Sequence, residues 1–205
     1  DALYVIVGLA GDAPDIRGQR VQSMLHRTFG TSLIEELPRS FMCASTELRS
    51  GQLRIARHGE LWESVGYSIN LPFLGPPVVR GRDLFVDGSL LDNLPVKTMA
   101  DMGEGPIIAV DVKATLERPQ PGPAAARGGD DRSLRPPSLN ETLMRVLLLG
   151  SENTSEAARR HADLVIKPRA QGIGLLEFHQ IDAAREAGRA AAREALQQAP
   201  AGLFA

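Results

Sequence analysis

The sequence has a single cysteine, Cys43, and therefore cannot form an internal disulfide. A protein without disulfides suits a reducing compartment, so a cytoplasmic location is expected, with any membrane association made through upstream segments. No apolar run approaches the ~20 residues that span a bilayer, and the start lacks the basic and apolar regions of a secretory signal. This chain alone is thus predicted to be neither a membrane span nor a secretory precursor. Because it begins at Asp1 rather than methionine, a piece of a longer protein is expected.

An excess of charge of one sign is also missing. The formal net charge is −2, which favours neither nucleic acid nor an acidic membrane surface as an electrostatic partner. Hydrophobic residues make up 43% and charged residues 23% of the 205 positions, the proportions of an ordinary globular protein. The length fits one domain.

Motifs for metals and phosphates are absent as well. There is no His-x-x-x-His or Cys-x-x-Cys pair, and the four histidines are scattered, so no zinc site is expected. Nothing resembles a Walker loop. The glycine loop at 171–174 is a poor phosphate cradle, because no strand leads directly into it and no Lys-Ser/Thr comes after it. No cofactor is predicted.

Hydrophobic periodicity predicts an alternation of helices and strands. Helical spacing of apolar residues occurs over 19–30, 60–69, 95–103, 138–149 and 178–197. Short apolar or alternating runs predict strands at 41–46, 53–56, 78–79, 84–86, 106–112 and 162–166. The first two strands and the next two are each separated by a tight turn and should form hairpins. The apolar run at 3–9 is too short to distinguish strand from helix.

The segment 117–137 differs from the rest of the chain. It is rich in proline, glycine, alanine and arginine and has almost no large apolar side chains. Such a composition cannot bury enough surface to order itself. A flexible insertion is therefore predicted there.

Asp87 is the most suggestive polar residue. The run Leu84-Phe85-Val86 delivers it directly into a turn that begins with Gly88. A carboxylate at the tip of a buried strand is a common way to present a catalytic group, although from spacing alone an aspartate that merely caps the next turn is the simpler interpretation. Asp111, at the far end of a later strand, is either a second site carboxylate or a hydrogen-bond partner of a neighbouring loop.

A nucleophile is harder to find. Gly66-Tyr67-Ser68-Ile69-Asn70 comes within one residue of the Gly-x-Ser-x-Gly elbow. It lies at the end of an amphipathic helix rather than between a strand and a helix, and Asn70 stands where the second glycine belongs. Ser68 is thus a weak candidate nucleophile, and Ser89 is better explained as a turn residue.

Four motifs, taken in order, carry a family resemblance. They are Glu-Leu-Trp-Glu-Ser-Val at 60–65, Ser-Ile-Asn-Leu-Pro-Phe-Leu-Gly-Pro-Pro-Val at 68–78, Leu-Phe-Val-Asp-Gly-Ser-Leu-Leu-Asp-Asn-Leu-Pro-Val at 84–96 and Ile-Ile-Ala-Val-Asp-Val at 107–112. The order and spacing over 33–112 resemble the second half of a patatin-like phospholipase domain, in the neuropathy target esterase branch. The segment 163–196 is similar to the closing strand, loop and helix of that family.

The resemblance implies an α/β fold of three layers with a mostly parallel central sheet, here incomplete at its N-terminal side. It also implies a Ser-Asp dyad that cleaves carboxylic esters of lysophospholipids or phospholipids. Asp87 aligns with the dyad aspartate, which would be the base. Gly88 and Ser89 complete an Asp-Gly-Gly/Ala motif with a small departure at its third position, and the motif continues through Asn93 and Pro95. The implied partners are a lipid ester, the upstream part of the domain and a peripheral membrane contact through the parent protein, but no nucleic acid.

One departure from the family pattern matters most. The glycine-rich oxyanion loop and the serine elbow occur nowhere in these 205 residues. We therefore expect residues 1–205 to be the C-terminal part of one esterase domain, inactive alone, with the nucleophile supplied from upstream. Isolation should also expose core surface and favour poor solubility or oligomerisation. The alternative is a non-catalytic patatin-like module with an interaction or regulatory role.

Overall fold

The computed structural model describes residues 18–72, 76–112, 139–169, 173 and 178–203. Its helices are α1 (Gly18–Phe29), α2 (Leu61–Ser68), α3 (Val96–Ala100), α4 (Leu139–Arg159) and α5 (Ile181–Gln197), with short 3-10 turns η1 (Ile34–Glu36), η2 (Gly88–Leu90) and η3 (Phe178–Gln180). Its strands are β1 (Cys43–Glu47), β2 (Gln52–Ala56), β3 (Val78–Arg80), β4 (Asp83–Asp87), β5 (Ile108–Val110) and β6 (Leu164–Ile166). No helix within the described ranges is long and apolar enough to cross a membrane.

The larger sheet is antiparallel, with the strand order β2-β1-β4-β3. Both predicted hairpins are present, β1 with β2 and β3 with β4. Their turns contain Gly51 and Gly81 at φ values of 66° and 60°, a conformation that glycine adopts without strain. The central pairing of β1 with β4 sets Ser45 opposite Asp87 and so fixes where the candidate carboxylate lies.

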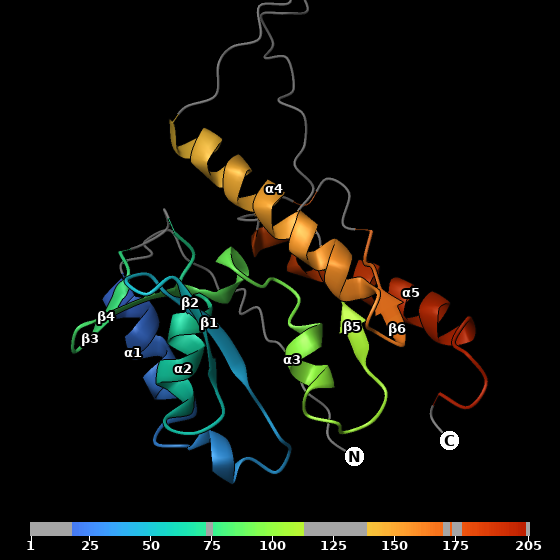
Figure 1. The fold of residues 1–205 in the computed structure, drawn as a ribbon, viewed down its shortest axis with the longest axis horizontal. Coiled ribbons are helices and arrows are strands. Elements are labelled where there is room, and N and C mark those ends of the chain that lie inside the picture. The colour runs from blue at the N-terminus through green and yellow to red at the C-terminus, as the bar shows by residue number, and fades with distance from the viewer. Residues whose placement is uncertain (1–17, 73–75, 113–138, 170–172, 174–177, 204–205) are drawn as a thin grey trace, which may run out of the picture.

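Helices α1 and α2 cover this sheet and enclose the first core. The two helices pack side by side, and α2 also packs on β1 (Figure 1). The buried centre of the cluster comprises Leu25, Ile34, Cys43, Leu61 and Val65. Leu25 is fully buried, as the periodicity of its helix predicts, and Cys43 is the small core residue that its isolation suggests.

The smaller sheet is a parallel pair, β5 with β6, in which Ile108 lies opposite Leu164. A second core joins it to the helices around it. Leu94, Val96 and Ala109 are buried there, and Ala158 from α4 packs against them. Helix α5 packs on β6, so α4 and α5 both border the pair.

The expected mostly parallel central sheet is not what the described residues form. Within the described ranges, four of the six strands pair antiparallel, and the one parallel pairing is β5 with β6. The reason is local, because turns of only a few residues can join antiparallel neighbours but not parallel ones. The structure establishes an α/β arrangement with one antiparallel and one parallel sheet. The predicted insertion at 117–137 and the apolar run at 3–9 lie outside the described residues.

Candidate active site at the end of strand β4

Asp87 is the last residue of β4 and the N-cap of η2. Its carboxylate oxygen Oδ1 accepts a hydrogen bond of 2.7 Å from the main-chain N–H of Ser89. Its own N–H donates to the carbonyl of Asn70 at 2.9 Å, and its carbonyl accepts from Thr46 Oγ1 at 3.1 Å. The carboxylate does cap the turn η2, and its backbone is held from two other segments as well.

Gly88 brings the turn η2 unusually close to the neighbouring strand. A Cβ atom at this position would lie 2.7 Å from both the carbonyl carbon and the oxygen of Ala44 in β1, and 2.8 Å from the Ala44 Cβ. Real Cβ atoms do not approach other atoms so closely. Glycine is therefore required for steric reasons next to Asp87, whichever role the carboxylate has.

The surroundings of Asp87 alter its acidity. Burial raises the pKa of the carboxyl above its ordinary value, and the hydrogen bonds from the main chain and side chain of Ser89 act in the opposite direction. Burial has the larger effect because it disfavours the charged form. A carboxylate with a raised pKa is a stronger proton acceptor, which is the property that a general base needs.

The structure places the candidate serines as the sequence suggests. Ser68 is the last residue of α2, not part of a turn between a strand and a helix. Ser89 lies in η2, where its N–H is part of the turn. Neither arrangement is that of an elbow nucleophile.

Asn70 and Thr46 are positioning residues that the sequence reasoning did not identify. The Asn70 side chain donates to the carbonyl of Phe85 at 3.2 Å and to that of Pro76 at 3.1 Å, so it ties the end of α2 to β4. Asn70 stands where a Gly-x-Ser-x-Gly elbow would have its second glycine, and its side chain anchors β4. The presence of asparagine at this position was the signal in the sequence that could have identified its role.

Two motif residues lie in the turn beyond the site. Asn93 is exposed between η2 and α3, and Pro95 is buried at the N-cap of α3. Between them and the site, Asp92 Oδ1 accepts from the Leu94 N–H at 3.2 Å. Burial raises the pKa of Asp92 also, and the hydrogen bond from Leu94 partly opposes it.

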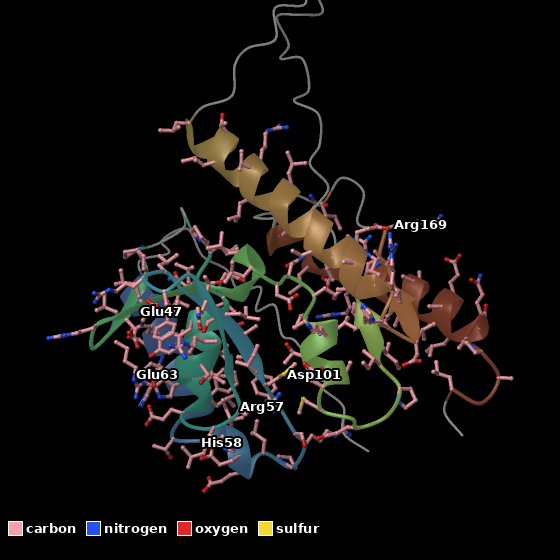
Figure 2. All side chains as sticks on the ribbon, in the orientation of Figure 1. Glu47, Arg57, His58, Glu63, Asp101 and Arg169 are labelled. Carbon is pink, nitrogen blue, oxygen red and sulfur yellow. The ribbon has the colours of Figure 1, made fainter. Side chains whose placement is uncertain are left out.

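Two further acidic residues are buried but serve the fold. Asp111 is 4% exposed, and Arg159 Nε of α4 donates to its Oδ2 at 2.7 Å, so this partner belongs to a helix and not to a neighbouring loop. Glu47, which is labelled in Figure 2, is 2% exposed. Its carboxylate accepts from the N–H groups of Arg49 and Ser50 at 2.9 and 2.7 Å. A hydrogen bond from the Ser50 side chain and those main-chain bonds lower the pKa of Glu47 to about 2.

No three His, Cys, Asp or Glu side chains in the described part of the chain are grouped so that they could hold a metal ion. The feature that combines a strand end, a fixed carboxylate and a raised pKa is thus Asp87 with its turn. Chemically, this arrangement can accept a proton from a hydroxyl brought up to the strand end.

No model of a known protein family matches this sequence. An uncharacterized NTE family protein of Mycobacterium tuberculosis is 40% identical over 197 residues, which is 90% of this chain and 33% of that protein. Lysophospholipase nte1 of Emericella nidulans and lysophospholipase NTE1 of Debaryomyces hansenii are each 27% identical, over 88% and 85% of this chain. The chain spans about a third of the bacterial relative and about an eighth of the fungal ones. Over most of its length the chain is homologous to proteins named as NTE family proteins and NTE1 lysophospholipases, which supports an NTE-like branch of the patatin-like proteins.

Proposed function

We propose that this chain supplies the aspartate of a Ser-Asp dyad in a lipid carboxylic-ester hydrolase of the lysophospholipase or phospholipase type. The observation that carries the proposal is Asp87, a carboxyl group with a raised pKa held at the end of β4. The fungal relatives are named lysophospholipases, which supports lysophospholipids as the substrate class.

Ester hydrolysis by a Ser-Asp dyad requires one proton acceptor held in a fixed position. As a serine hydroxyl attacks the ester carbonyl, Asp87 takes the hydroxyl proton, and it then gives that proton to the departing alcohol. The acyl group is then bonded to the serine oxygen. A water molecule attacks this acyl-serine while Asp87 takes a proton from the water, and the proton is returned to the serine oxygen as the fatty acid leaves. Main-chain amides would stabilise the oxyanion. The hydrogen bonds to Asn70, Thr46 and Ser89 restrict the movement of the Asp87 backbone and carboxylate.

The nucleophile has to come from elsewhere in the protein. The 205 residues contain no Gly-x-Ser-x-Gly, and Ser68 ends a helix. We therefore assign the serine and the oxyanion loop to residues outside this sequence, consistent with relatives about three times as long or longer. The 205 residues alone should be inactive.

A matched pair of substitutions in the full-length protein tests this proposal. Asp87→Asn should lower the hydrolysis of a lysophospholipid by roughly 100-fold or more, because general-base catalysis contributes about that much. Asp92→Asn is the control, since Asp92 is also an aspartate with a raised pKa but lies five residues beyond the strand end. It should stay within about threefold of the unaltered protein, the scale of an indirect effect.

Three results would contradict the proposal. One is full activity of the Asp87→Asn protein. A second is failure of a fluorophosphonate probe to label the full-length protein. The third is hydrolysis of a p-nitrophenyl ester by the 205-residue chain that disappears in Ser68→Ala, which would place the nucleophile inside this sequence.

The missing elbow favours a second candidate function, a non-catalytic interaction or regulatory module. In that case the full-length protein would bind no fluorophosphonate, and Asp87→Asn would change neither its fold nor any activity. Fluorophosphonate labelling of the full-length protein therefore distinguishes the hydrolase from the non-catalytic module.

A further inference from the structure

Ser89 directs two hydrogen-bond donors at the carboxyl group of Asp87. Its main-chain N–H donates to Oδ1 at 2.7 Å, and its hydroxyl donates to the same carboxyl group. The first donor belongs to the backbone and would be present with any residue except proline at position 89. The second belongs to the serine side chain, so a single substitution can remove it and leave the cap of the turn in place.

The turn η2 is closed by bonds that do not involve this hydroxyl. The N–H of Leu91 donates to the carbonyl of Gly88 at 3.0 Å. Gly88 itself lies against the main chain of Ala44, which leaves η2 no room to move toward β1. The backbone therefore fixes Ser89 beside Asp87, and the contact made by the hydroxyl is with the Asp87 carboxyl group.

We propose that Ser89 is a positioning residue whose hydroxyl holds the ionised Asp87 carboxyl group in place for the attacking serine. This inference rests on the proposed function, in which Asp87 is the proton acceptor. A carboxylate accepts hydrogen bonds with both oxygens, and a hydroxyl donor therefore favours the ionised form over the protonated form. Ser89 thus keeps the acceptor available at a lower pH than burial alone would allow.

The acidity of Asp87 depends on burial and on Ser89 rather than on a neighbouring charge. Burial raises the pKa of Asp87, and the two bonds from Ser89 lower it. The elements that pack against β4 or η2 are β1, β3, α2 and α4. The described titratable side chains on these strands are Cys43, Glu47 and Arg80, and those on these helices are Glu63, Tyr67, Arg145, Glu156 and Arg159. None of these groups is a cause of the shift at Asp87, so removing the Ser89 hydroxyl should raise the pKa further.

The pH dependence of ester hydrolysis by the full-length protein tests this role. The acidic limb of the kcat/KM profile reports the pKa of the essential base in the free enzyme. In Ser89→Ala this limb should move to higher pH by roughly 0.5 to 1 unit, the scale of one lost hydrogen bond to a half-buried carboxylate. On the limb the variant should be roughly three- to tenfold slower than the unaltered protein. Above the limb it should be at least as fast, because the base is stronger.

Matched variants separate the hydroxyl from other effects of the substitution. Ser89→Thr keeps the hydroxyl and should leave the limb where it is in the unaltered protein. Ser50→Ala removes a turn hydroxyl that donates to another carboxylate, that of Glu47, and should also leave the limb in place. Ser89→Gly lacks the hydroxyl as well and should reproduce the shift if Ser89→Ala does not fold.

The outcomes distinguish this inference from the proposed function. An unmoved limb in Ser89→Ala, in a protein that Asp87→Asn inactivates, would refute the role of Ser89 and leave the dyad standing. An equal shift in Ser89→Thr or in Ser50→Ala would also refute it, because the shift would not come from the Ser89 hydroxyl. Full activity of the Asp87→Asn protein would refute the proposed function, and the role of Ser89 with it.

Discussion

Replacing Gly88 by alanine tests whether the turn after Asp87 is pressed against β1 as the structure shows. The added Cβ would meet two main-chain atoms of Ala44 at 2.7 Å, whereas ordinary van der Waals contact begins at 3.4 Å. Neither partner is a flexible side chain, so β1 and β4 must separate where Ser45 pairs with Asp87. Overpacking of this kind lowers the free energy of unfolding by about 2–3 kcal/mol.

The measurement is thermal unfolding. For a chain of this length 1 kcal/mol corresponds to roughly 2–4 °C, so Gly88→Ala should lower the midpoint by roughly 4–12 °C. Gly188→Ala in α5 is the matched control, because nothing lies within 4 Å of its added Cβ. That change should stabilise the protein by up to about 1 kcal/mol through helix propensity. An unchanged midpoint for Gly88→Ala, alongside the expected rise for Gly188→Ala, would refute the close approach of η2 to β1.

Three other changes test the buried carboxyl groups. Glu47 has a folded pKa of about 2, below its ordinary 4.5, so the unfolded chain binds more protons between those values and stability falls as the pH drops through that window. Urea titrations between pH 5 and 2 should show a smaller pH dependence for Glu47→Gln, and an equal dependence would contradict the assignment. Arg159→Met leaves Asp111 buried without its partner and should lower the free energy of unfolding by about 3–5 kcal/mol, with partial recovery on adding Asp111→Asn. The pKa of Asp87 is raised instead, so its negative charge opposes folding at pH values above the ordinary pKa of 3.8. The Asp87→Asn protein should therefore unfold at the same or a higher urea concentration than the unaltered protein at pH 7. Unfolding at a lower urea concentration would show that the charged carboxylate is needed for folding.

Local sequence signals predicted the individual elements well. The tight turns with Gly51 and Gly81 are encoded by adjacent residues, and both hairpins formed where those glycines indicated. Helix α2 ends before Pro72, as the restriction on the residues preceding a proline requires. In each case the determinant and its effect lie within a few residues of each other.

Pairings between distant segments were not predictable in the same way. Whether β5 pairs with β4 or with β6 is decided by contacts across more than fifty residues, and no local pattern encodes that choice. The same holds for the bond between Arg159 and Asp111, which are 48 positions apart. Glu47 is a partial exception, because an acidic residue just before Arg49-Ser50-Gly51 can accept from the amides of a turn.

The structural and catalytic interpretations of Asp87 turn out to be compatible. Capping requires one carboxylate oxygen to accept from the Ser89 N–H, and this bond restricts the side-chain rotamer. General-base catalysis requires a carboxyl group in a fixed place with a raised pKa, and burial supplies that shift against the effect of the cap. The bond that makes Asp87 a turn residue is thus one of the interactions that would hold it in position for a serine. For this reason, spacing in the sequence could locate Asp87 but could not choose between the two roles.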